Sequence, residues 1–422
     1  MSIKNISGIA FTVLLTACVA HRSAYGPGWS AVHADGHNSD YAHITGARKL
    51  QPAWQKKFDG PINLGATTGK DGKVYITTSA AGCHLYCLDA RTGETLWCTD
   101  AVNRYAVASS ALLDREGRLF LADDEAMHAF DNKGHLLWET PIKGFPLSAQ
   151  FTQSGRLIFI THIGNVYVLD RKNGKPLING QNLSPSFAAD STFNPIACMK
   201  GTRDCPCANT LAFDEKNGRL IFTYWQPGTA SAALWAMQYT EQPQPAIIKL
   251  WENNSLPGGS ASSPDISSDG SRVYVNDNNG YLYAIDARHG NIIWKYKIGF
   301  NPGGSPSTSP EGYIMPAGGS GGKMMCIQDK GDSAVFIWKN DYWTNRGLPA
   351  QAKGMVAYAT VASKAGRFHN DLLVLDVLSG RELDRHTLPG TTIFSVGTTI
   401  GPEGNVYVPT FNGWLFAFKP DY

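Results

Sequence analysis

The sequence predicts an all-β protein, an eight-bladed β-propeller made of four-stranded blades. The first observation is composition. The 422-residue chain contains 44 Gly and 23 Pro, and 11% of its residues are aromatic, which favours short strands joined by tight turns over long helices. The second is a repeat whose copies mostly begin about 40 to 48 residues apart, the length of one four-stranded blade. The third is that the last copy lacks its final strand, and a segment that could supply this strand precedes the first copy.

The repeat is clearest in two copies that align residue by residue. Gly72–Trp97 contains Val-Tyr-Ile, then Leu-Asp-Ala-Arg-Thr-Gly, then Trp, and Ser271–Trp294 contains Val-Tyr-Val, then Ile-Asp-Ala-Arg-His-Gly, then Trp. The further copies are Gly117–Trp138, Gly155–Ile178, Gly218–Trp251, Gly312–Trp338, Met355–Leu388 and the segment that begins at Gly404. These copies together predict eight blades.

Each blade is expected to hold an inner strand, a β-branched and aromatic second strand, a third strand, and a fourth strand that ends in Trp. The Asp and Gly of the Asp-Ala-x-x-Gly phrase suit the hairpin before that last strand, because Asp bonds to the turn backbone and Gly accepts a positive φ. As Asp, Gly and Trp recur at one spacing in blade after blade, we interpret them as packing and turn residues and not as catalytic groups.

The eighth copy stops before a Trp-bearing strand. It contains Val406-Tyr-Val and Leu415-Phe-Ala-Phe, while Pro52–Phe58, which precedes the first copy, carries Trp54. If this segment pairs with the last blade, no blade lacks its fourth strand. We therefore expect one propeller domain over residues 50–422, closed by its N-terminal strand.

The first residues predict export. Lys4 precedes the short apolar stretch Ile9–Leu15, which is far below the roughly 20 residues that span a bilayer. The string Leu-Thr-Ala-Cys that ends at Cys18 resembles a bacterial lipobox, in which the Cys receives the lipid. We expect residues 1–17 to be a lipoprotein signal peptide and residues 18–49 to be a lipidated tether and lead-in segment. An ordinary signal peptide that contains a Cys is the alternative.

The residue after the lipobox bears on the destination. Val19 stands where an Asp would favour retention in the inner membrane of a Gram-negative bacterium. We therefore expect a lipid anchor in the outer membrane, with the propeller facing the periplasm.

Seven cysteines follow Cys18, and export places them in an oxidising compartment. A turn near Thr92 would place Cys87 nearly opposite Cys98, so a disulfide between these two is the leading expectation. In a Cys-rich insertion at about residues 180–207, Cys198 with Cys205 or Cys207 would close a small loop, and the insertion would form a cap.

A zinc site is the alternative for the first cysteine group. It would use Cys83, His84, Cys87 and Cys98. Adjacent strand residues point to opposite faces, and the spacing matches no common zinc motif. We therefore expect no metal site.

The charge pattern and the motif search exclude several classes of function. Charged residues make up 17% of the chain, are interleaved, and leave a net charge of +2, so nucleic acid is not expected as a partner. Gly318–Gly322 fits the letters G-x-S-x-G, but it lies in a predicted Gly-rich turn and lacks the strand-turn-helix setting of a nucleophilic serine. The sequence carries no phosphate loop, Rossmann fingerprint or His-Glu-x-x-His string.

The loops of one face of the ring supply the candidate binding residues. Turns between second and third strands, together with loops that lead into inner strands, would gather around the channel. Mixed aromatic and ionisable side chains there would suit a small ligand, although a solvated polar rim is the plainer interpretation. These candidates are Arg104, Tyr105, Asp123, Asp124, His162, Tyr224, Trp225, Asn276, Asp277, Trp343 and Arg346.

The repeated phrase resembles a known family. Leu-Asp-Ala-x-Thr-Gly-x-x-x-Trp, as in Leu88–Trp97, resembles the tryptophan-docking repeat of the pyrroloquinoline-quinone (PQQ) repeat superfamily. That superfamily contains quinoprotein alcohol dehydrogenases and the lipoprotein subunit that assists outer-membrane barrel assembly. The stretch from Gly28 to Trp54 also resembles the lead-in segment of the quinoprotein dehydrogenases. The resemblance implies tryptophan docking in an eight-bladed propeller over nearly the whole mature chain.

The resemblance also indicates what a dehydrogenase would need. Quinoproteins hold PQQ with Ca²⁺, a general-base Asp, basic residues and two consecutive Cys. This chain has no Cys-Cys pair and no segment of the Trp-Asp-Tyr-Asp-Pro type. We therefore expect no cofactor, with PQQ and calcium as the alternative.

Two functions from different classes follow. The favoured one is an envelope lipoprotein whose propeller is an interaction scaffold or binding platform for envelope proteins, without recognisable catalytic residues. The alternative is a PQQ-dependent dehydrogenase that oxidises a small alcohol-type substrate in the periplasm. A small-molecule-binding or hydrolytic propeller is a third possibility that the sequence does not rank.

Overall fold

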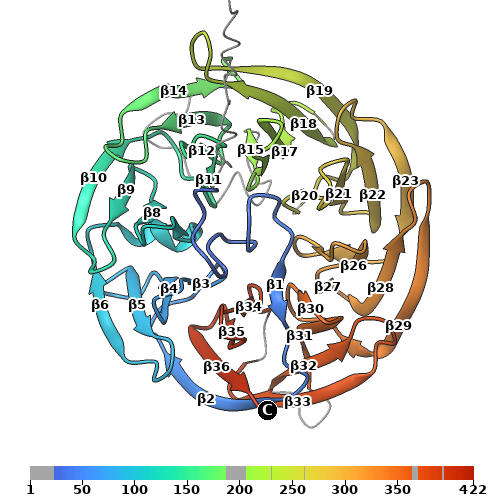
Figure 1. Ribbon diagram of the computed structural model, residues 1–422. Helices are drawn as coiled ribbons and strands as arrows, with labels where there is room; N and C mark the ends of the chain where they lie inside the picture. The colour runs from blue at the N-terminus through green and yellow to red at the C-terminus, as the bar shows by residue number, and fades with distance from the viewer. Residues whose placement is uncertain (1–22, 187–205, 230, 261, 364–368, 392–393) are drawn as a thin grey trace, which may run out of the picture.

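The computed structural model of the chain describes residues 23–186, 206–229, 231–260, 262–363, 369–391 and 394–422. In these residues, eight blades stand around a central axis (Figure 1), each with a four-stranded antiparallel core. A short 3-10 helix, η1 (Arg104–Ala108), follows the first blade. The predicted all-β, eight-bladed propeller is confirmed. Among the described residues, no helix has the length and apolar character that crossing a membrane requires.

The strands of each blade follow one another from the axis outward. The first four blades are β3 (Thr67–Thr68), β4 (Lys73–Thr77), β5 (Leu85–Asp89) and β6 (Thr95–Thr99); β7 (Leu112–Leu113), β8 (Leu119–Ala122), β9 (Ala126–Phe130) and β10 (Leu136–Pro141); β11 (Gln150–Phe151), β12 (Leu157–Ile160), β13 (Asn165–Leu169) and β14 (Pro176–Asn182); and β15 (Cys207–Ala208) with β16 (Ala212–Asp214), β17 (Arg219–Trp225), β18 (Ser231–Thr240) and β19 (Ala246–Pro257).

The remaining blades repeat this order, and the last one borrows a strand from the N-terminal part of the chain. They are β20 (Asp265–Ile266), β21 (Arg272–Asn276), β22 (Tyr281–Asp286) and β23 (Ile292–Lys297); β25 (Ser307–Thr308), β26 (Tyr313–Met315), β28 (Lys323–Asp329) and β29 (Ala334–Thr344), with the side pair β24 (Asn301–Pro302) and β27 (Gly319–Ser320); β30 (Ala350–Lys353), β31 (Val356–Ala362), β32 (Asn370–Asp376) and β33 (Glu382–Leu388); and β34 (Thr399–Ile400), β35 (Val406–Pro409), β36 (Trp414–Pro420) and β2 (Leu50–Lys57).

The core lies between the blades. Every residue of β8 and β9 is buried, whereas most of the outer strand β10 is exposed. Middle strands are covered on both faces because neighbouring blades pack face to face, so they read as apolar runs such as Leu-Phe-Leu-Ala in β8. The outer strands keep polar residues because one edge meets water.

Where an outer strand carries a tryptophan, its indole joins that blade to the next one. Trp54 donates its indole N–H to the Ala90 carbonyl at 3.0 Å. Its ring covers Gly93, which has a φ of 74° and where an added Cβ would lie 2.6 Å from the indole. The same kind of bond joins Trp97 to Asn132, Trp138 to Arg171, Trp251 to Ala287 and Trp338 to Val377. The repeated Trp and Gly are therefore packing residues, as predicted.

The ring closes as expected. Strand β2 pairs antiparallel with β36, from Leu50 opposite Pro420 to Lys57 opposite Trp414. This pairing joins the described N-terminal part of the chain to its end and completes the eighth blade (Figure 1).

The described part of the expected tether and lead-in segment at residues 18–49 is not a free tether. Residues 23–49, which we call the plug, run through the middle of the ring, where Figure 1 draws them in dark blue. Ala24 and Trp29 are 1% and 2% exposed, and Asn38 is fully buried. Strand β1 (Tyr41–Thr45) within the plug pairs in parallel with β30. Residues 1–22, including Cys18 and the expected signal peptide, lie outside the described residues.

The plug satisfies the inner edges of the blades. An innermost strand has no neighbouring strand toward the axis. Its backbone N–H groups that point toward the axis would therefore stay unpaired without the plug. Six plug carbonyls accept these N–H groups at 2.6 to 2.9 Å: Trp29 from Thr68, Ser30 from Leu113, Gly36 from Phe213, His37 from Ile266, Ser39 from Thr308 and Asp40 from Gln351. The donors belong to six different blades, which explains why the plug sequence shows no single periodicity.

Candidate functional site

Two cavities border the plug, one toward each face of the ring. The first is lined by turns between first and second strands, such as Asp214–Asn217, and by Ser23. The second is lined by loops that lead into inner strands, such as Asn63–Gly65 and Gly303–Ser305. These positions are opposite ends of the inner strands. We call the faces the N-terminal face, after Ser23, and the connecting face.

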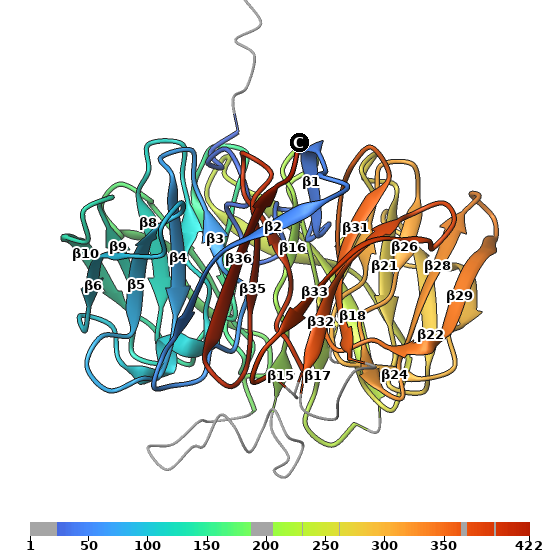
Figure 2. The same cartoon turned by 90° about the horizontal axis from the view of Figure 1, so that it is seen from below.

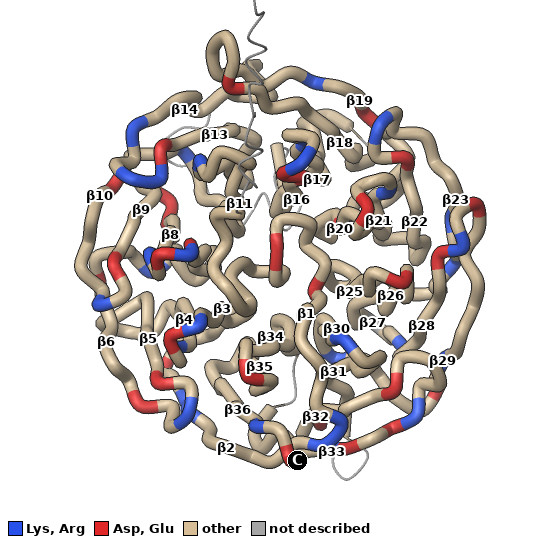
Figure 3. Tube along the Cα trace, viewed as in Figure 1, with Lys and Arg blue, Asp and Glu red and all other residues tan. Residues whose placement is uncertain are grey.

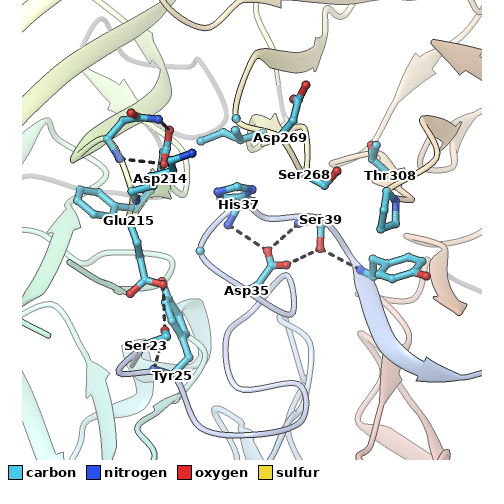
Figure 4. A pocket seen from close by; sticks show the side chains of 18 of the residues that line it. Ser23, Tyr25, Asp35, His37, Ser39, Asp214, Glu215, Ser268, Asp269 and Thr308 are labelled. Carbon is cyan, nitrogen blue, oxygen red and sulfur yellow. Dashed lines mark hydrogen bonds between the residues drawn. The ribbon is translucent and has the colours of Figure 1, made fainter. Parts of the chain in front are cut away.

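The cavity of the N-terminal face has a volume of about 760 Å³ and an acidic lining (Figure 4). Asp35 of the plug accepts hydrogen bonds from the backbone N–H groups of His37 and Ser39 and from the Ser39 hydroxyl. Ser23 donates its hydroxyl to Glu215 at 2.9 Å. Asp214 caps its own turn through the backbone N–H groups of Lys216 and Asn217, so these carboxylates mostly hold local turns.

Glu215 is the carboxyl whose charge is most costly in this cavity. Burial raises the pKa of Glu215 to about 7, and the negative charges of Asp35 and Asp214 add to the rise, while Ser23 and Arg115 oppose it. One of its oxygens, Oε1, is buried and has no hydrogen-bond partner among the described residues. The N-terminal face therefore carries a side chain that titrates near neutral pH.

A second carboxyl lies fully buried behind the same lining. Burial raises the pKa of Asp265 well above its usual range, and Asp35 and Asp40 raise it further. The nearby Thr308 hydroxyl opposes this rise, although it does not reach either carboxylate oxygen with full hydrogen-bond geometry. Burial therefore disfavours the charged form of the Asp265 carboxyl.

The cavity of the connecting face, which we call the central cavity, has a volume of about 230 Å³. The plug forms part of its lining with Trp29, Val32, His33 and Asp40. His33 Nδ1 lies 2.9 Å from Asp40 Oδ2, and both side chains are less than 10% exposed. Burial raises the pKa of Asp40, and the charge and hydrogen bond of His33 oppose that rise.

The lining of the central cavity does not fit PQQ with calcium. PQQ carries three carboxylates, which need cationic partners, and no Lys or Arg stands among the lining residues. Asp40 is the sole carboxylate of that lining. In the part of the chain that the structure describes, no group of three or more His, Cys, Asp or Glu is arranged to hold a metal ion. We therefore derive no step through this cofactor.

The residues proposed from the sequence for the funnel face lie mainly inside the blades. Hydrogen bonds from His128 and from the backbone N–H groups of Asn103, Ala126 and Glu125 overcome burial and lower the pKa of Asp123 to about 2. Asp277 is fully buried, caps the Asn279 and Tyr281 N–H groups, and accepts the Tyr283 hydroxyl. Both carboxylates therefore stabilise hairpins.

Other members of that set are also held by their own blades or loops. His162 stacks on Phe145 with ring centroids 4.2 Å apart, and burial lowers the pKa of His162 to about 4. Tyr224 shares a 2.6 Å hydrogen bond with Ser184, and Asn276 donates to the Gly304 carbonyl. The remaining members have these neighbours: Arg104 stacks on Tyr105, Asp124 accepts from Asn103, Trp225 donates to Thr229, Arg385 lies over Trp343, and the Arg346 N–H donates to Thr360.

None of these eleven residues lines either cavity. The residues that do so include His33, Asp35, His37 and Asp40, which sequence reasoning treated as part of a tether. The signal that could have found them is the stretch from Gly28 to Trp54, which contains all four and resembles the lead-in segment of the quinoprotein dehydrogenases. Ligand binding by the funnel-face residues stays a prediction.

The disulfide is a correction. Cys83 is bonded to Cys98, and Cys87 is free and buried. In the β5–β6 ladder, Cys87 stands opposite Trp97, and Cys98 stands opposite Tyr86. Because side chains alternate across a sheet, this offset of one residue sends the Cys87 and Cys98 side chains to opposite faces. The disulfide also removes the alternative zinc site.

The second cysteine group is described only in part. Cys207 is a free thiol at the start of β15. Cys198 and Cys205 lie outside the described residues, as does most of the expected cap.

Comparisons with known proteins agree with this architecture. The chain is 28% identical to the protein Rv3035 of Mycobacterium tuberculosis, over 93% of this chain and 96% of that protein. It is 23% identical to the quinoprotein alcohol dehydrogenase PedH of Pseudomonas putida, over 90% of this chain and 77% of that protein. The crystal structure of BamB from Moraxella catarrhalis superimposes with a TM-score of 0.59 and 15% identity, covering 88% of this chain and 99% of that one.

A family model matches residues 43–197 and 211–419, which is most of the propeller. The model is described as outer membrane protein assembly factor BamB, within the PQQ-like repeat proteins. Tryptophan docking, eight blades and closure by β2 are the structural counterparts of that match. The chain therefore belongs to the PQQ-like propeller family that is represented by the outer membrane protein assembly factor BamB.

Proposed function

We propose that this protein is an envelope lipoprotein whose propeller is a binding platform for other envelope proteins. Cys18 would anchor it in the outer membrane of a Gram-negative bacterium, with the propeller in the periplasm. The observation that carries this proposal is the family match over residues 43–197 and 211–419, because the family is described as an outer membrane assembly factor. The position of the plug adds a geometric argument.

The course of the plug supports an anchor beside one face. Cys18 precedes Ser23 by five positions, and Ser23 lines the cavity of the N-terminal face. Five extended residues reach roughly 17 Å at most. A lipid on Cys18 would therefore hold the N-terminal face next to the membrane and present the connecting face to soluble or membrane-bound partners.

Charge on the N-terminal face does not replace the anchor. Figure 3, viewed as in Figure 1, shows acidic and basic residues alternating around the ring. A surface of mixed sign gives little net attraction to an anionic membrane. Membrane association should therefore depend on the lipid.

The anchor is tested with Cys18→Ser. The wild-type protein should take up labelled fatty acid and sediment with membranes, and the variant should do neither. Val19→Asp is the matched variant for destination, since it should keep the label and move the protein to the inner membrane. Persistence of acylation and sedimentation in Cys18→Ser would contradict the lipoprotein proposal.

The platform role is tested in cells that lack the protein. Loss of an assembly platform should lower the amount of folded outer-membrane β-barrel proteins. Wild-type protein should restore it, and Cys18→Ser should restore it poorly. Photo-crosslinkers at Arg104 on the connecting face and at Lys216 on the N-terminal face should capture different proteins. The crosslinker at Arg104 should capture a component of barrel assembly. Unchanged barrel levels together with no such crosslink would contradict this role.

The alternative function is a PQQ-dependent dehydrogenase acting on a small alcohol. Its support is the similarity to the quinoprotein alcohol dehydrogenase PedH over 90% of the chain. The central-cavity lining speaks against it, as described above. Addition of PQQ and Ca²⁺ to the mature protein should change neither the melting temperature nor dye-coupled alcohol oxidation. A raised melting temperature with turnover would establish the alternative, because a ligand of the folded state must stabilise it.

A further inference from the structure

The His33–Asp40 pair is held near the axis of the ring by hydrogen bonds to the inner strands. The Asp40 carbonyl accepts the Gln351 backbone N–H and the Ser307 hydroxyl, each at 2.9 Å. The backbone of the plug has a positive φ at three non-glycine positions, which are Ala34 at 72°, Asn38 at 61° and Asp40 at 47°. Such conformations cost free energy and persist where the surrounding structure enforces them, often at ligand sites.

The carboxylate of Asp40 keeps one oxygen available. Its Oδ2 is bonded to His33 Nδ1, whereas its Oδ1 makes no hydrogen bond to any other described residue. Asp40 is 4% exposed and lines the central cavity. The lining contains no Lys or Arg to neutralise this carboxylate. A buried carboxylate whose one ionisable partner in the lining is a histidine, with no Lys or Arg, favours a positively charged ligand, because opposite charges attract strongly where water is scarce.

Aromatic rings supply part of the cavity wall. Trp29, Phe394 and Phe411 all line it. The Trp29 indole N–H is already donated to the Val32 carbonyl at 3.3 Å, so the ring itself is what remains to contact a ligand. Phe394 and Phe411 stack with centroids 6.2 Å apart. Ring faces carry a negative quadrupole that attracts ammonium groups, above all when these are poorly hydrated.

The size of the cavity limits the ligand. A volume of about 230 Å³ lies below the common range of drug-sized sites, roughly 300 to 1,000 Å³. The Thr210 and Thr398 side chains also line it, and neither hydroxyl donates to another described residue. The space therefore suits a compact cation that carries a hydroxyl or another small polar group.

We propose that the central cavity is a binding site for a small alkylammonium ion, with Asp40 as its counter-ion and the three aromatic rings as its walls. His33 is a positioning residue that fixes the carboxylate through Nδ1. The site lies on the connecting face, so a ligand would enter between the loops that lead into the inner strands. This inference does not depend on the platform role or on the anchor.

The test compares choline with its neutral carbon isostere, 3,3-dimethyl-1-butanol, by calorimetric titration of the mature protein. The two molecules have nearly the same shape and differ in charge. Choline should bind at least ten-fold more tightly than the isostere and should raise the melting temperature. Equal binding of both would overturn the proposal in favour of a neutral ligand, and no saturable binding of choline below about 10 mM would overturn it outright.

Matched variants locate the site. Asp40→Asn keeps the shape and an acceptor for His33 but removes the charge, and it should weaken choline binding at least ten-fold while leaving the isostere unaffected. Asp269→Asn removes a carboxylate from the cavity of the opposite face and should leave choline binding unchanged. Choline binding that survives Asp40→Asn, or that is lost in a folded Asp269→Asn variant, would contradict the proposal. If Asp40→Asn fails to fold, the choline and isostere comparison on the wild type decides.

Discussion

At the residue scale, Glu215 links the charge of the N-terminal face to stability. Its carboxyl is held by Ser23 at 2.9 Å and surrounded by Asp35 and Asp214. The pKa of about 7 in the folded protein lies above the ordinary value of 4.5. Below pH 4.5 both folded and unfolded chains keep the proton, and as pH rises toward 7 the unfolded chain loses it first. The wild-type side chain therefore destabilises the folded state increasingly over this range.

Replacing Glu215 with Gln should remove that penalty. Glu215→Gln should stabilise the protein at pH 8 relative to pH 4 by about 2 kcal/mol, which is less than the full shift implies because the carboxyl is partly exposed. Thermal melts of both proteins at the two pH values measure this difference. Glu94→Gln, at an exposed hairpin, is the control and should show no such pH dependence. A constant difference between Glu215→Gln and wild type from pH 4 to pH 8 would refute the assignment.

The disulfide is a second prediction at the residue scale. Non-reducing peptide mapping should find Cys83 linked to Cys98, which are separated by 15 positions. For a loop of that length, reduction should lower the free energy of unfolding by about 3 kcal/mol. A Cys83→Ser, Cys98→Ser double variant should show the lower stability and no response to reductant. A peptide that links Cys87 to Cys98 would contradict the structure.

At the element scale, the hairpin glycines under the tryptophans make a measurable contribution to blade packing. Gly93 and Gly72 have similar φ values, 74° and 70°. An added Cβ at Gly93 would lie 2.6 Å from the Trp54 indole, whereas at Gly72 it would meet nothing within 4 Å. An alanine at either site would therefore meet the same free-energy cost of a positive φ, but only at Gly93 would its Cβ also collide with the Trp54 indole.

This pair separates conformational strain from packing. Gly72→Ala should cost about 1 kcal/mol from its positive φ alone, and Gly93→Ala should cost about 3 kcal/mol because Trp54 must also shift. The free energies of unfolding of the two variants measure the difference, and the additional loss should shrink in a Trp54→Ala background. Equal losses in the two glycine variants would show that the tryptophan contact contributes little.

The elements also show which residues the sequence could place. Asp89, Asp286 and their equivalents were assigned to hairpin turns, and Asp89 does accept the backbone N–H groups of Arg91 and Thr92. The pairing of Cys87 with Cys98 was wrong because it required the β5–β6 register to within one residue. The bulge between Cys87 and Leu88 shifts that register, and a bulge leaves no clear mark in the local pattern.

At the scale of the whole molecule, closure of the ring predicts a cooperative structure. Figure 2 shows β2 lying along β36 at the side of the ring, and these strands pair over the length of β2. Replacing the 8 residues of β2 with Gly and Ser in equal number keeps the plug connected but removes the last strand. The melting temperature should fall by more than about 10 °C, because an unpaired edge replaces a closed sheet.

The control for closure is Trp54→Ala, which keeps the ladder and loses only the docked ring. It should lower the melting temperature by a smaller amount than replacement of β2. If replacement of β2 and Trp54→Ala give the same melting temperature, the strand pairing does not hold the ring closed.

The sequence by itself determined the architecture of this protein: eight repeats, the Trp and Gly that join the blades, and the strand that closes the ring. These features repeat at one spacing, so each copy supports the others. Only the tertiary structure decided the course of residues 23–49 and the lining of both cavities. Six plug carbonyls meet six different blades, and loops from distant parts of the chain complete the cavity linings around His33, Asp35 and Asp40, so no local pattern records those contacts.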